Sequence, residues 1–452
     1  MSQPVRDCMN LGALVGALSH ALDLTEGQPP GHCLRAAHLG RRVGAHLGLR
    51  GERLDDLWFT IVLKDLGCSS NAARICELYL ADDIAFKRDF KEIDGSPGAA
   101  LRFVLARTGM KTQGRAGWSE RLRSIVHILN NGGTIAHELI ETRCHRGADI
   151  AARMRFGDGV QSGIRSLDER WDGSGKPEGL EGEGIPLFSR IALAAQVFDI
   201  FHSGGGLDAA RREIVARSGT WFDPAVADAL SAVADRPGLS AELANGEGLV
   251  AAAPQTSVPI DESYLDEVAA AFADVVDAKS PFTSGHCERV TLYADMIAEE
   301  MGLAPDRRRR LRRAALLHDI GKLGVGNDIL DKPGRPDEGE WEVIRAHPVH
   351  GRRILELAGA FADCAHVAGD HHETLDGTGY PNGIGGDAIA LETRIVTVAD
   401  VFDALSADRP YRDAMPVAKA LAILNEGIGT AFDGHCVEAL ERGLARMDAL
   451  AA

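Results

Sequence analysis

The sequence is poor in several features that would each indicate a class of protein. Aromatic residues fill 5% of its 452 positions, which favours packed helices over sheet. No apolar run approaches the ~18–20 residues of a membrane span, and the N-terminus lacks the basic and apolar segments of a signal peptide. The eight Cys include no CxxC pair, which argues against a disulfide framework and a thiolate zinc site. We therefore expect a cytoplasmic protein without a membrane segment.

Basic residues are also fewer than acidic residues. The 49 Lys and Arg residues stand against 66 Asp and Glu residues, for a net charge of −17. Because phosphate binding depends on Lys and Arg, this balance argues against a general nucleic-acid binder or a partner of anionic membranes. An anionic substrate would need a local concentration of positive charge. The residue present in unusual number is His, which occurs 16 times.

The sequence contains an internal repeat. Short stretches recur in the same order, first 254 residues apart and later 204 residues apart. The pairs include Gly31-His32-Cys33 with Gly285-His286-Cys287, Lys64-Asp65-Leu66-Gly67 with His318-Asp319-Ile320-Gly321, and Phe198-Asp199 with Phe402-Asp403. The smaller offset means that the first copy carries about 50 extra residues, which we place between about 78 and 133. We predict two copies of one domain, at 1–236 and 261–452, joined by a linker at 237–260 rich in Gly, Ala, Ser and Pro.

Helical periodicity dominates both copies. Between 261 and 278, Tyr264, Val268 and Phe272 fall on one stripe with acidic residues opposite. No convincing alternating strand pattern occurs, so we predict an all-α protein of two bundles. The Arg-rich run at 307–313 is expected to be a solvated helix face.

The second copy concentrates side chains that bind metals. Imidazole and carboxylate groups without thiolate suit Zn, Fe, Mn or Ni. Two adjacent divalent cations can supply a nucleophilic hydroxide and stabilise charge on a phosphate. The candidate metal ligands are His318, Asp319, His347, His371, His372 and Asp400.

These motifs resemble the HD-GYP family, a subgroup of the HD metal-dependent phosphohydrolases. The resemblance covers roughly 262–442 and rests on His318-Asp319-Ile320-Gly321-Lys322, His347-Pro348, His371-His372-Glu373, Asp376-Gly377-Thr378-Gly379-Tyr380-Pro381, Ala399-Asp400-Val401-Phe402-Asp403 and Asp408-Arg409-Pro410-Tyr411-Arg412. It implies two HD-type helical bundles in tandem. It also implies hydrolysis of cyclic di-GMP to linear pGpG, and to GMP if the linear product rebinds. Partners implied are cyclic di-GMP and a diguanylate cyclase (GGDEF) domain docked on the Gly-Tyr-Pro loop, while a homodimer is left open.

The resemblance also assigns roles. The six candidate ligands would hold two divalent metal ions, Fe or Mn by family preference, with Zn or Ni also compatible. Asp319 would bridge them, and Lys322 would contact the phosphate during catalysis. Further substrate contacts are assigned to Tyr380, Arg409 and Arg412. Some members hold a third metal through a Glu four residues before the position of His286; that position here is Phe282, so we expect two metals and leave open whether His286 is a ligand.

The first copy has lost most of this set. At the matching positions stand Lys64, Asp65, Arg143, Leu167, Asp168 and Gln196, with His145 opposite His347 if the alignment slips by two residues. Only Asp65 clearly survives, and a Lys in place of the first His brings positive charge to the site. We predict a pseudo-enzyme domain with a regulatory or structural role.

Two other functions fit the same residues. One is an HD phosphohydrolase of another cyclic dinucleotide, such as cyclic GMP-AMP. The other is a cyclic di-GMP receptor or scaffold that acts through protein contacts, which the intact ligand set disfavours.

Overall fold

The computed structural model describes residues 10–93, 98, 102–104, 106, 117–255, 260–408 and 413–451. Arg409 and Arg412, predicted to bind substrate, lie outside these residues. In the described part of the chain the regular structure is helical, with two isolated β-bridges and no strand. The all-α prediction is therefore confirmed. None of the described helices combines the length and apolar character needed to cross a bilayer.

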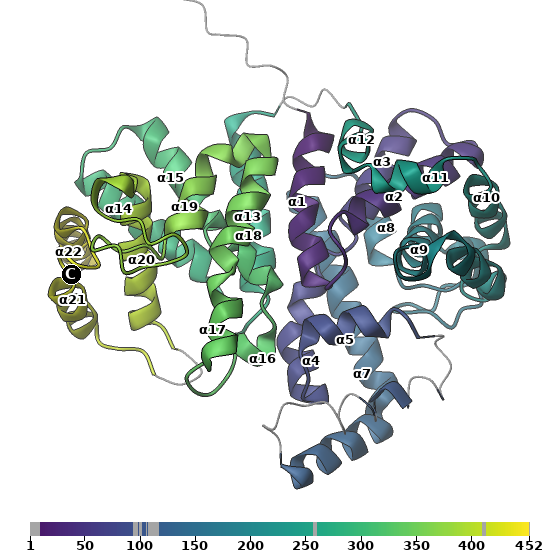
Figure 1. The fold of residues 1–452 in the computed structure, drawn as a ribbon, viewed down its shortest axis with the longest axis horizontal. Helices are drawn as coiled ribbons and strands as arrows, with labels where there is room; N and C mark the ends of the chain where they lie inside the picture. Colours follow the sequence, from purple (N-terminus) through teal and green to yellow (C-terminus); the bar gives the residue numbers. More distant parts are fainter. Residues whose placement is uncertain are drawn as a thin grey trace, which may run out of the picture. The chain divides into compact units, whose positions relative to one another are not determined.

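The chain divides into two compact units between Tyr264 and Leu265. The first unit contains the N-terminal copy of the repeat (Figure 1). Its main helices are α1 Leu11–Thr25, α2 His32–His46, α3 Glu52–Val62, α4 Ala72–Tyr79, α5 Asp83–Phe90, α7 Trp118–Arg153, α8 Asp158–Arg165, α9 Leu187–Arg217, α10 Pro224–Ala234, α11 Leu239–Ala244 and α12 Gly246–Ala251.

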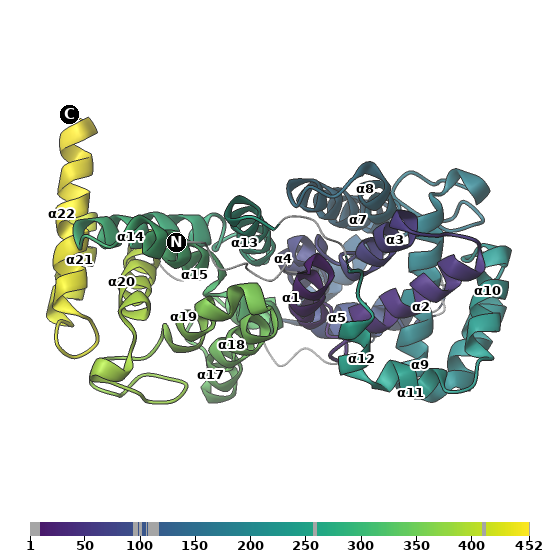
Figure 2. The ribbon, with the colours of Figure 1, turned by 90° about the horizontal axis from the view of Figure 1, so that it is seen from above.

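The second unit contains the C-terminal copy (Figure 2). Helix α13 starts three residues before the boundary between the units. Its helices are α13 Glu262–Asp277, α14 His286–Glu300, α15 Pro305–Leu317, α16 Asn327–Leu330, α17 Glu338–Arg345, α18 His347–Leu357, α19 Ala365–Asp370, α20 Leu391–Ser406, α21 Val417–Glu426 and α22 Gly434–Ala451.

The two units repeat the same packing. In the first, α2 contacts α3, α9 and α10; in the second, α14 contacts α15, α20 and α22. Each of these central helices starts after a glycine in the left-handed region, Gly31 (φ 84°) or Gly285 (φ 66°), where other residues are strained. The apolar faces of the helices form the core of each unit. Repetition of sequence thus reappears as repetition of packing.

Much of the segment 237–260, which we predicted to be a linker, is helical and belongs to the first unit. Residues 239–251 form α11 and α12, which belong to the first unit. Leu239, Leu243 and Leu249 are buried, and Asn245 caps α12 through its side chain. The reason is that a few well-spaced leucines suffice to fold a Gly- and Ala-rich segment onto a core.

The extra residues of the first copy form a small hydrophobic cluster. It joins α4, α5 and the N-terminal part of α7 through Ile75, Leu78, Tyr79, Phe86, Ile128 and Ile135. The Tyr79 and Phe86 rings lie 4.2 Å apart between centroids. This arrangement places α5, and Lys91 just after it, beside the core of the first unit.

The Arg-rich run on α15 is not simply solvated, which corrects the sequence prediction. Arg308 and Arg312 both bond to Asp295 of α14, at 2.8 and 3.0 Å. Arg313 is buried and bonds to Asp266 at 2.5 Å. Acidic residues on neighbouring helices, distant in sequence, pair with the run and hold α15 in place.

Candidate metal centre

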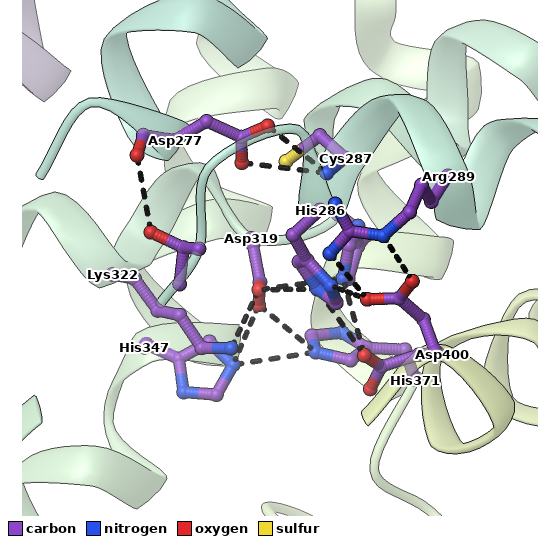
Figure 3. Close-up of polar contacts among 12 residues, drawn as sticks. Asp277, His286, Cys287, Arg289, Asp319, Lys322, His347, His371 and Asp400 are labelled. Carbon is purple, nitrogen blue, oxygen red and sulfur yellow. Dashed lines mark hydrogen bonds and ion pairs between the residues drawn. The ribbon is translucent and has the colours of Figure 1, made fainter. Parts of the chain in front are cut away.

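Five helices of the second unit bring the candidate ligands together, and Figure 3 shows His286, Asp319, His347, His371 and Asp400 among them. Most of the ligands sit at helix ends: His286 begins α14, His318 caps α15, His347 begins α18, and His371 caps α19. Asp319 follows His318 directly, His372 follows His371, and Asp400 lies within α20. All except His372 are buried. Their convergence explains why residues spread over more than a hundred positions form one site.

Asp319 lies between two groups of imidazoles. Its Oδ1 is 3.4 Å from Nε2 of His347 and 3.6 Å from Nε2 of His371. Its Oδ2 is 3.4 Å from Nε2 of His318 and 3.5 Å from Nε2 of His286. Each oxygen of one carboxylate thus faces a different pair of ring nitrogens, the geometry that a bridging ligand of two metal ions requires.

Two ligand groups follow from these distances. Donor atoms of His347, His371 and His372 all lie within 4.8 Å of one another, and so do those of His286, His318 and Asp400. Asp400 Oδ1 is 3.3 Å from Nε2 of His286. The structure therefore brings His286 into the second group, and three histidines or two histidines with a carboxylate would complete each site beside Asp319.

Backbone carbonyls fix how three of the rings point. Nδ1 of His318, His347 and His371 lies 2.7, 2.6 and 3.0 Å from the carbonyl oxygen three residues earlier. A carbonyl only accepts, so each Nδ1 carries the proton and each Nε2 lone pair faces the centre. The buried Nε2 of His286 and His318 and the Oδ1 of Asp319 have no hydrogen-bond partner among the described residues. A set of inward-facing lone pairs and carboxylates fits divalent cations.

Burial controls the charge of the imidazoles. It lowers the pKa of His318 to about 4 and that of His347 to about 3. Both rings are therefore neutral at pH 7 and able to coordinate. Burial would also lower the pKa of His286, but the neighbouring carboxylates of Asp319, Asp400 and Asp403 outweigh it and raise that pKa to about 10. The carboxylates that hold a proton on His286 would equally attract a cation.

The predicted substrate contacts surround this centre. Lys322 Nζ lies 2.5 Å from Asp319 Oδ2, which places its ammonium at the edge of the ligand set. Tyr380 stacks on His372 with centroids 4.8 Å apart. The guanidinium of Arg345 lies 5.7 Å from the Tyr380 ring, a neighbour that the sequence analysis missed although it stands two residues before His347.

Two acidic residues that the sequence analysis did not assign to the site, Asp403 and Glu373, hold the ligands or the neighbouring loop in position. Asp403 Oδ2 is 2.7 Å from His286 Nδ1, and its Oδ1 accepts a hydrogen bond from Arg289 Nε at 2.6 Å. Glu373 Oε1 accepts from the backbone amides of Asn382 and Gly383 at 2.7 and 3.1 Å, which ties the loop around Tyr380 to the helix end that carries the His pair. The repeated Phe402-Asp403 stretch was a sequence signal for the first of these supports.

The first unit retains the same supports. His32 Nδ1 is 2.8 Å from Asp199, which also bonds to Arg35 at 2.8 Å. Gly67 packs against the backbone carbonyl of Arg143, as Gly321 does against that of His347. This equivalence places Arg143 at the position of His347, so the alternative alignment through His145 does not apply.

Side-chain cations occupy the centre of the first unit. Lys64, at the position of His318, pairs with Asp65. Arg143 bonds to Asp168, at the position of His372, at 2.7 Å. Lys91, which comes from the inserted residues, lies 2.5 Å from Glu26 and 3.9 Å from Asp65. Donor atoms of Glu26, Asp65 and Cys68 do lie within 4.8 Å of one another. However, ammonium and guanidinium groups neutralise the acids, and burial raises the pKa of the Cys68 thiol, so these residues do not fit metal ions.

The first unit also lacks a loop. Its α9 continues through a break at Gly206 (φ 76°), where the second unit has two separate helices, α20 and α21. The offset between the copies rises here from 204 to 210 residues. Arg409 and Arg412 belong to the interval between α20 and α21, so the first copy has no equivalent of either.

Comparisons with known proteins agree with these motifs. The HD domain family matches residues 121–226 and 270–436. The 3'3'-cGAMP-specific phosphodiesterase 3 of Vibrio cholerae is 50% identical over 438 residues, which cover 96% of this chain and 94% of that protein. The crystal structure of a cyclic GMP-AMP specific phosphodiesterase of V. cholerae, V-cGAP3, aligns with a TM-score of 0.67 and 45% identity over 97% of this chain and 98% of that one.

A shorter match is to a response regulator. The cyclic di-GMP phosphodiesterase response regulator RpfG of Xanthomonas campestris is 41% identical over 184 residues, or 40% of this chain and 49% of that protein. The nearly full-length likeness to the V. cholerae protein, together with the ordered HD and Gly-Tyr-Pro motifs, shows that this chain belongs to the HD-GYP family of HD-domain proteins.

Proposed function

We propose that the second unit is a metal-dependent phosphodiesterase of cyclic dinucleotides. The observation that carries the proposal is Asp319, whose two oxygens face two groups of buried imidazoles with inward lone pairs. Two divalent cations held there would supply a hydroxide nucleophile at neutral pH and stabilise charge on the phosphate. In this proposal His318, His347, His371, His372, Asp400 and His286 are the remaining ligands.

The chain's own residues would orient the substrate. The Lys322 ammonium stands beside the bridging carboxylate and can neutralise an oxygen of the scissile phosphate as a point charge. The Tyr380 ring, stacked on His372, offers a flat surface beside the centre, and the exposed Arg345 guanidinium lies over it. A cyclic dinucleotide carries two phosphodiesters and two bases, so both a cation and a ring surface at the site fit this substrate class.

For the substrate itself we propose 3'3'-cGAMP, with cyclic di-GMP as the second candidate. The relative that matches nearly the whole chain, including the first unit, is named for 3'3'-cGAMP. The cyclic di-GMP phosphodiesterase RpfG matches only 40% of the chain, which supports the reaction class more than the base preference. A linear dinucleotide would be the first product of either substrate.

The first unit, in our proposal, is not catalytic. Lys64, Arg143 and Lys91 neutralise its central acids, and the loop that carries the predicted substrate arginines is absent. Its role would be structural or regulatory.

The test measures metal content and product formation on the full chain. Wild type, Asp319→Asn and the first-unit equivalent Asp65→Asn are purified without chelator and assayed with 3'3'-cGAMP and cyclic di-GMP in the presence of Mn²⁺ or Fe²⁺. We expect turnover of 3'3'-cGAMP to exceed that of cyclic di-GMP, and to fall with bound metal in Asp319→Asn but not in Asp65→Asn. Tight binding without a linear product under either condition would instead identify a receptor.

A further inference from the structure

The first unit contains a cleft of about 500 Å³ that none of its central charged residues lines. Helix α2 forms one wall and α3 another, while the end of α10 and Ala252, just after α12, complete it. The lining side chains are His38, Arg41, Arg42, Ala45, His46, Leu54, Trp58, Ala232, Val233, Arg236 and Ala252. The volume lies within the range of small-molecule sites.

Positive charge lines this cleft in a protein of net charge −17. Its ionisable lining residues are three Arg and two His, with no acid among them. Arg41 pairs with Asp55 at 3.0 Å and Arg42 with Glu242 at 2.7 Å. Arg236 is exposed and forms no ion pair with any described residue. A net positive charge therefore remains at the cleft after the neighbouring acids are counted.

The second unit provides an internal comparison. Where α2 has Arg41, Ala45 and His46, the equivalent helix α14 has Asp295, Glu299 and Glu300. Asp295 pairs with Arg308 and Arg312 of α15, and Glu299 pairs with Arg446 of α22 at 3.1 Å. In the second unit, acidic residues of α14 therefore form ion pairs with arginines of α15 and α22, and these pairs hold the three helices together.

The first unit has changed both sides of these contacts. Leu54 and Trp58 stand where α15 has Arg308 and Arg312, so apolar side chains replace the arginines of that helix, while Arg41 of α2 still pairs with Asp55 of α3. Arg236 keeps the position of Arg446 but has lost its acidic partner, because His46 and Ala45 replace Glu300 and Glu299. These substitutions leave fewer ion pairs between the helices than in the second unit, and a net positive rim beside apolar side chains.

This combination fits one ligand chemistry. Guanidinium groups bind phosphate oxygens through paired, charge-assisted hydrogen bonds. The apolar floor formed by the accessible side chains of Leu54, Ala45 and Ala232, above the buried Trp58 and Val233, would take a flat hydrophobic ring. We propose that the cleft binds a nucleoside phosphate, with the phosphate on the arginines and the base on the floor. The site is independent of the metal centre of the second unit.

The test is direct binding to the full chain. Isothermal titration calorimetry with GMP, AMP, GTP, ATP and inorganic phosphate would be carried out with chelator present, which suppresses metal-dependent binding in the second unit. The key variant is Arg42→Gln/Arg236→Gln. Arg212→Gln is the matched control, because Arg212 is an exposed arginine of the same unit without an ion pair to a described residue and does not line the cleft.

We expect at least one nucleotide to bind with a submillimolar Kd, at least about tenfold weaker in the double variant and unchanged in Arg212→Gln. Circular dichroism would verify that the variants are folded. Absence of nucleotide binding, or equal binding by wild type and double variant, would overturn the proposal. Inorganic phosphate that binds as tightly as the nucleotides would overturn the assignment of the floor to a base. Phosphodiesterase activity of the same preparations is a separate readout, so failure of this proposal does not depend on the proposed reaction.

Discussion

Replacing Lys91 by Met should strongly destabilise the first unit. The Lys91 ammonium lies 2.5 Å from Glu26 and 3.9 Å from Asp65, and the exposed fractions of the three side chains are 14%, 2% and 0%. Removal of one partner of a buried ion pair leaves the other charge uncompensated, which costs about 3–5 kcal/mol. Met keeps most of the length and apolar character of the side chain, so the loss would come from the charge.

An exposed pair in the same unit supplies the control. Arg74 and Glu77 lie 2.7 Å apart, similar to Lys91 and Glu26, but their exposed fractions are 44% and 70%. Arg74→Met should therefore change the free energy of unfolding by less than about 1 kcal/mol. Comparing the two variants separates the effect of burial from the effect of distance.

Urea unfolding of the full chain, followed by Trp fluorescence, measures both effects. Four of the five Trp residues, at 58, 118, 171 and 221, belong to the first unit, and Trp341 belongs to the second. With an m-value of about 3 kcal/mol/M, the expected loss lowers the midpoint of the first unit by about 1 M or more. A free energy within about 1 kcal/mol of wild type for Lys91→Met would refute the idea that side-chain cations replace metal ions in this core.

The effect should also depend on pH. Burial raises the pKa of Glu26, but Lys91 and the other nearby cations outweigh burial and lower this pKa from 4.5 to about 2. A lowered folded-state pKa contributes stability that is present above pH 4.5 and is lost as the pH falls toward 2. In Lys91→Met the lone carboxyl is protonated more easily, so the stability difference between variant and wild type should shrink over this window. An unchanged difference from pH 6 to pH 3 would contradict this account.

Three further predictions concern the two centres. In the proposed function only the second unit binds metal, so chelator should lower the melting temperature of the second unit in calorimetry and leave the first unit's transition unchanged; a shift of both transitions would contradict the metal-free core. Asp403→Asn should reduce metal content and turnover by about 10–100-fold through loss of the His286 support, whereas the equivalent Asp199→Asn should leave metal content unchanged. Arg345→Gln should raise KM for the cyclic dinucleotide about three- to tenfold with little change in kcat in steady-state kinetics, since its guanidinium lies over Tyr380 and not at the metal ligands; a fall in kcat alone would argue against this role.

Much of the candidate site could be predicted from the sequence, because the ligands stand at helix ends. His318, His347 and His371 each end or begin a helix. A short motif at a helix end can be recognised in the sequence because it lies next to the turn that follows or precedes the helix. The sequence also predicted that the first copy lacks most ligands, because Lys64 stands at the position that corresponds to His318 in the repeat. Ligand roles remain predictions, but the structure does bring all the predicted ligands into one place.

Other features could not be predicted, for physical reasons. Lys91 belongs to the inserted residues and has no counterpart in the second copy, so the repeat gave no signal that its ammonium enters the core. Pairing of Arg313 with Asp266 depends on how two helices pack, not on local sequence. Helices α11 and α12 are short and rich in Gly and Ala, and contacts with the rest of the first unit, such as the burial of Leu239, Leu243 and Leu249, stabilise them.

The charged core of the first unit also limits what single mutations can do over evolutionary time. A reversion of Lys64 to His would restore one imidazole, but the positive charges of Lys91 and Arg143 would remain within the same buried site and repel a divalent cation. Removal of either of those cations first would leave Glu26 or Asp168 without its partner in the unit's interior. Any route back to metal binding therefore passes through intermediates that neither bind metal nor fold as stably. The metal-free state that we propose for this half of the chain is therefore one that single substitutions cannot easily reverse.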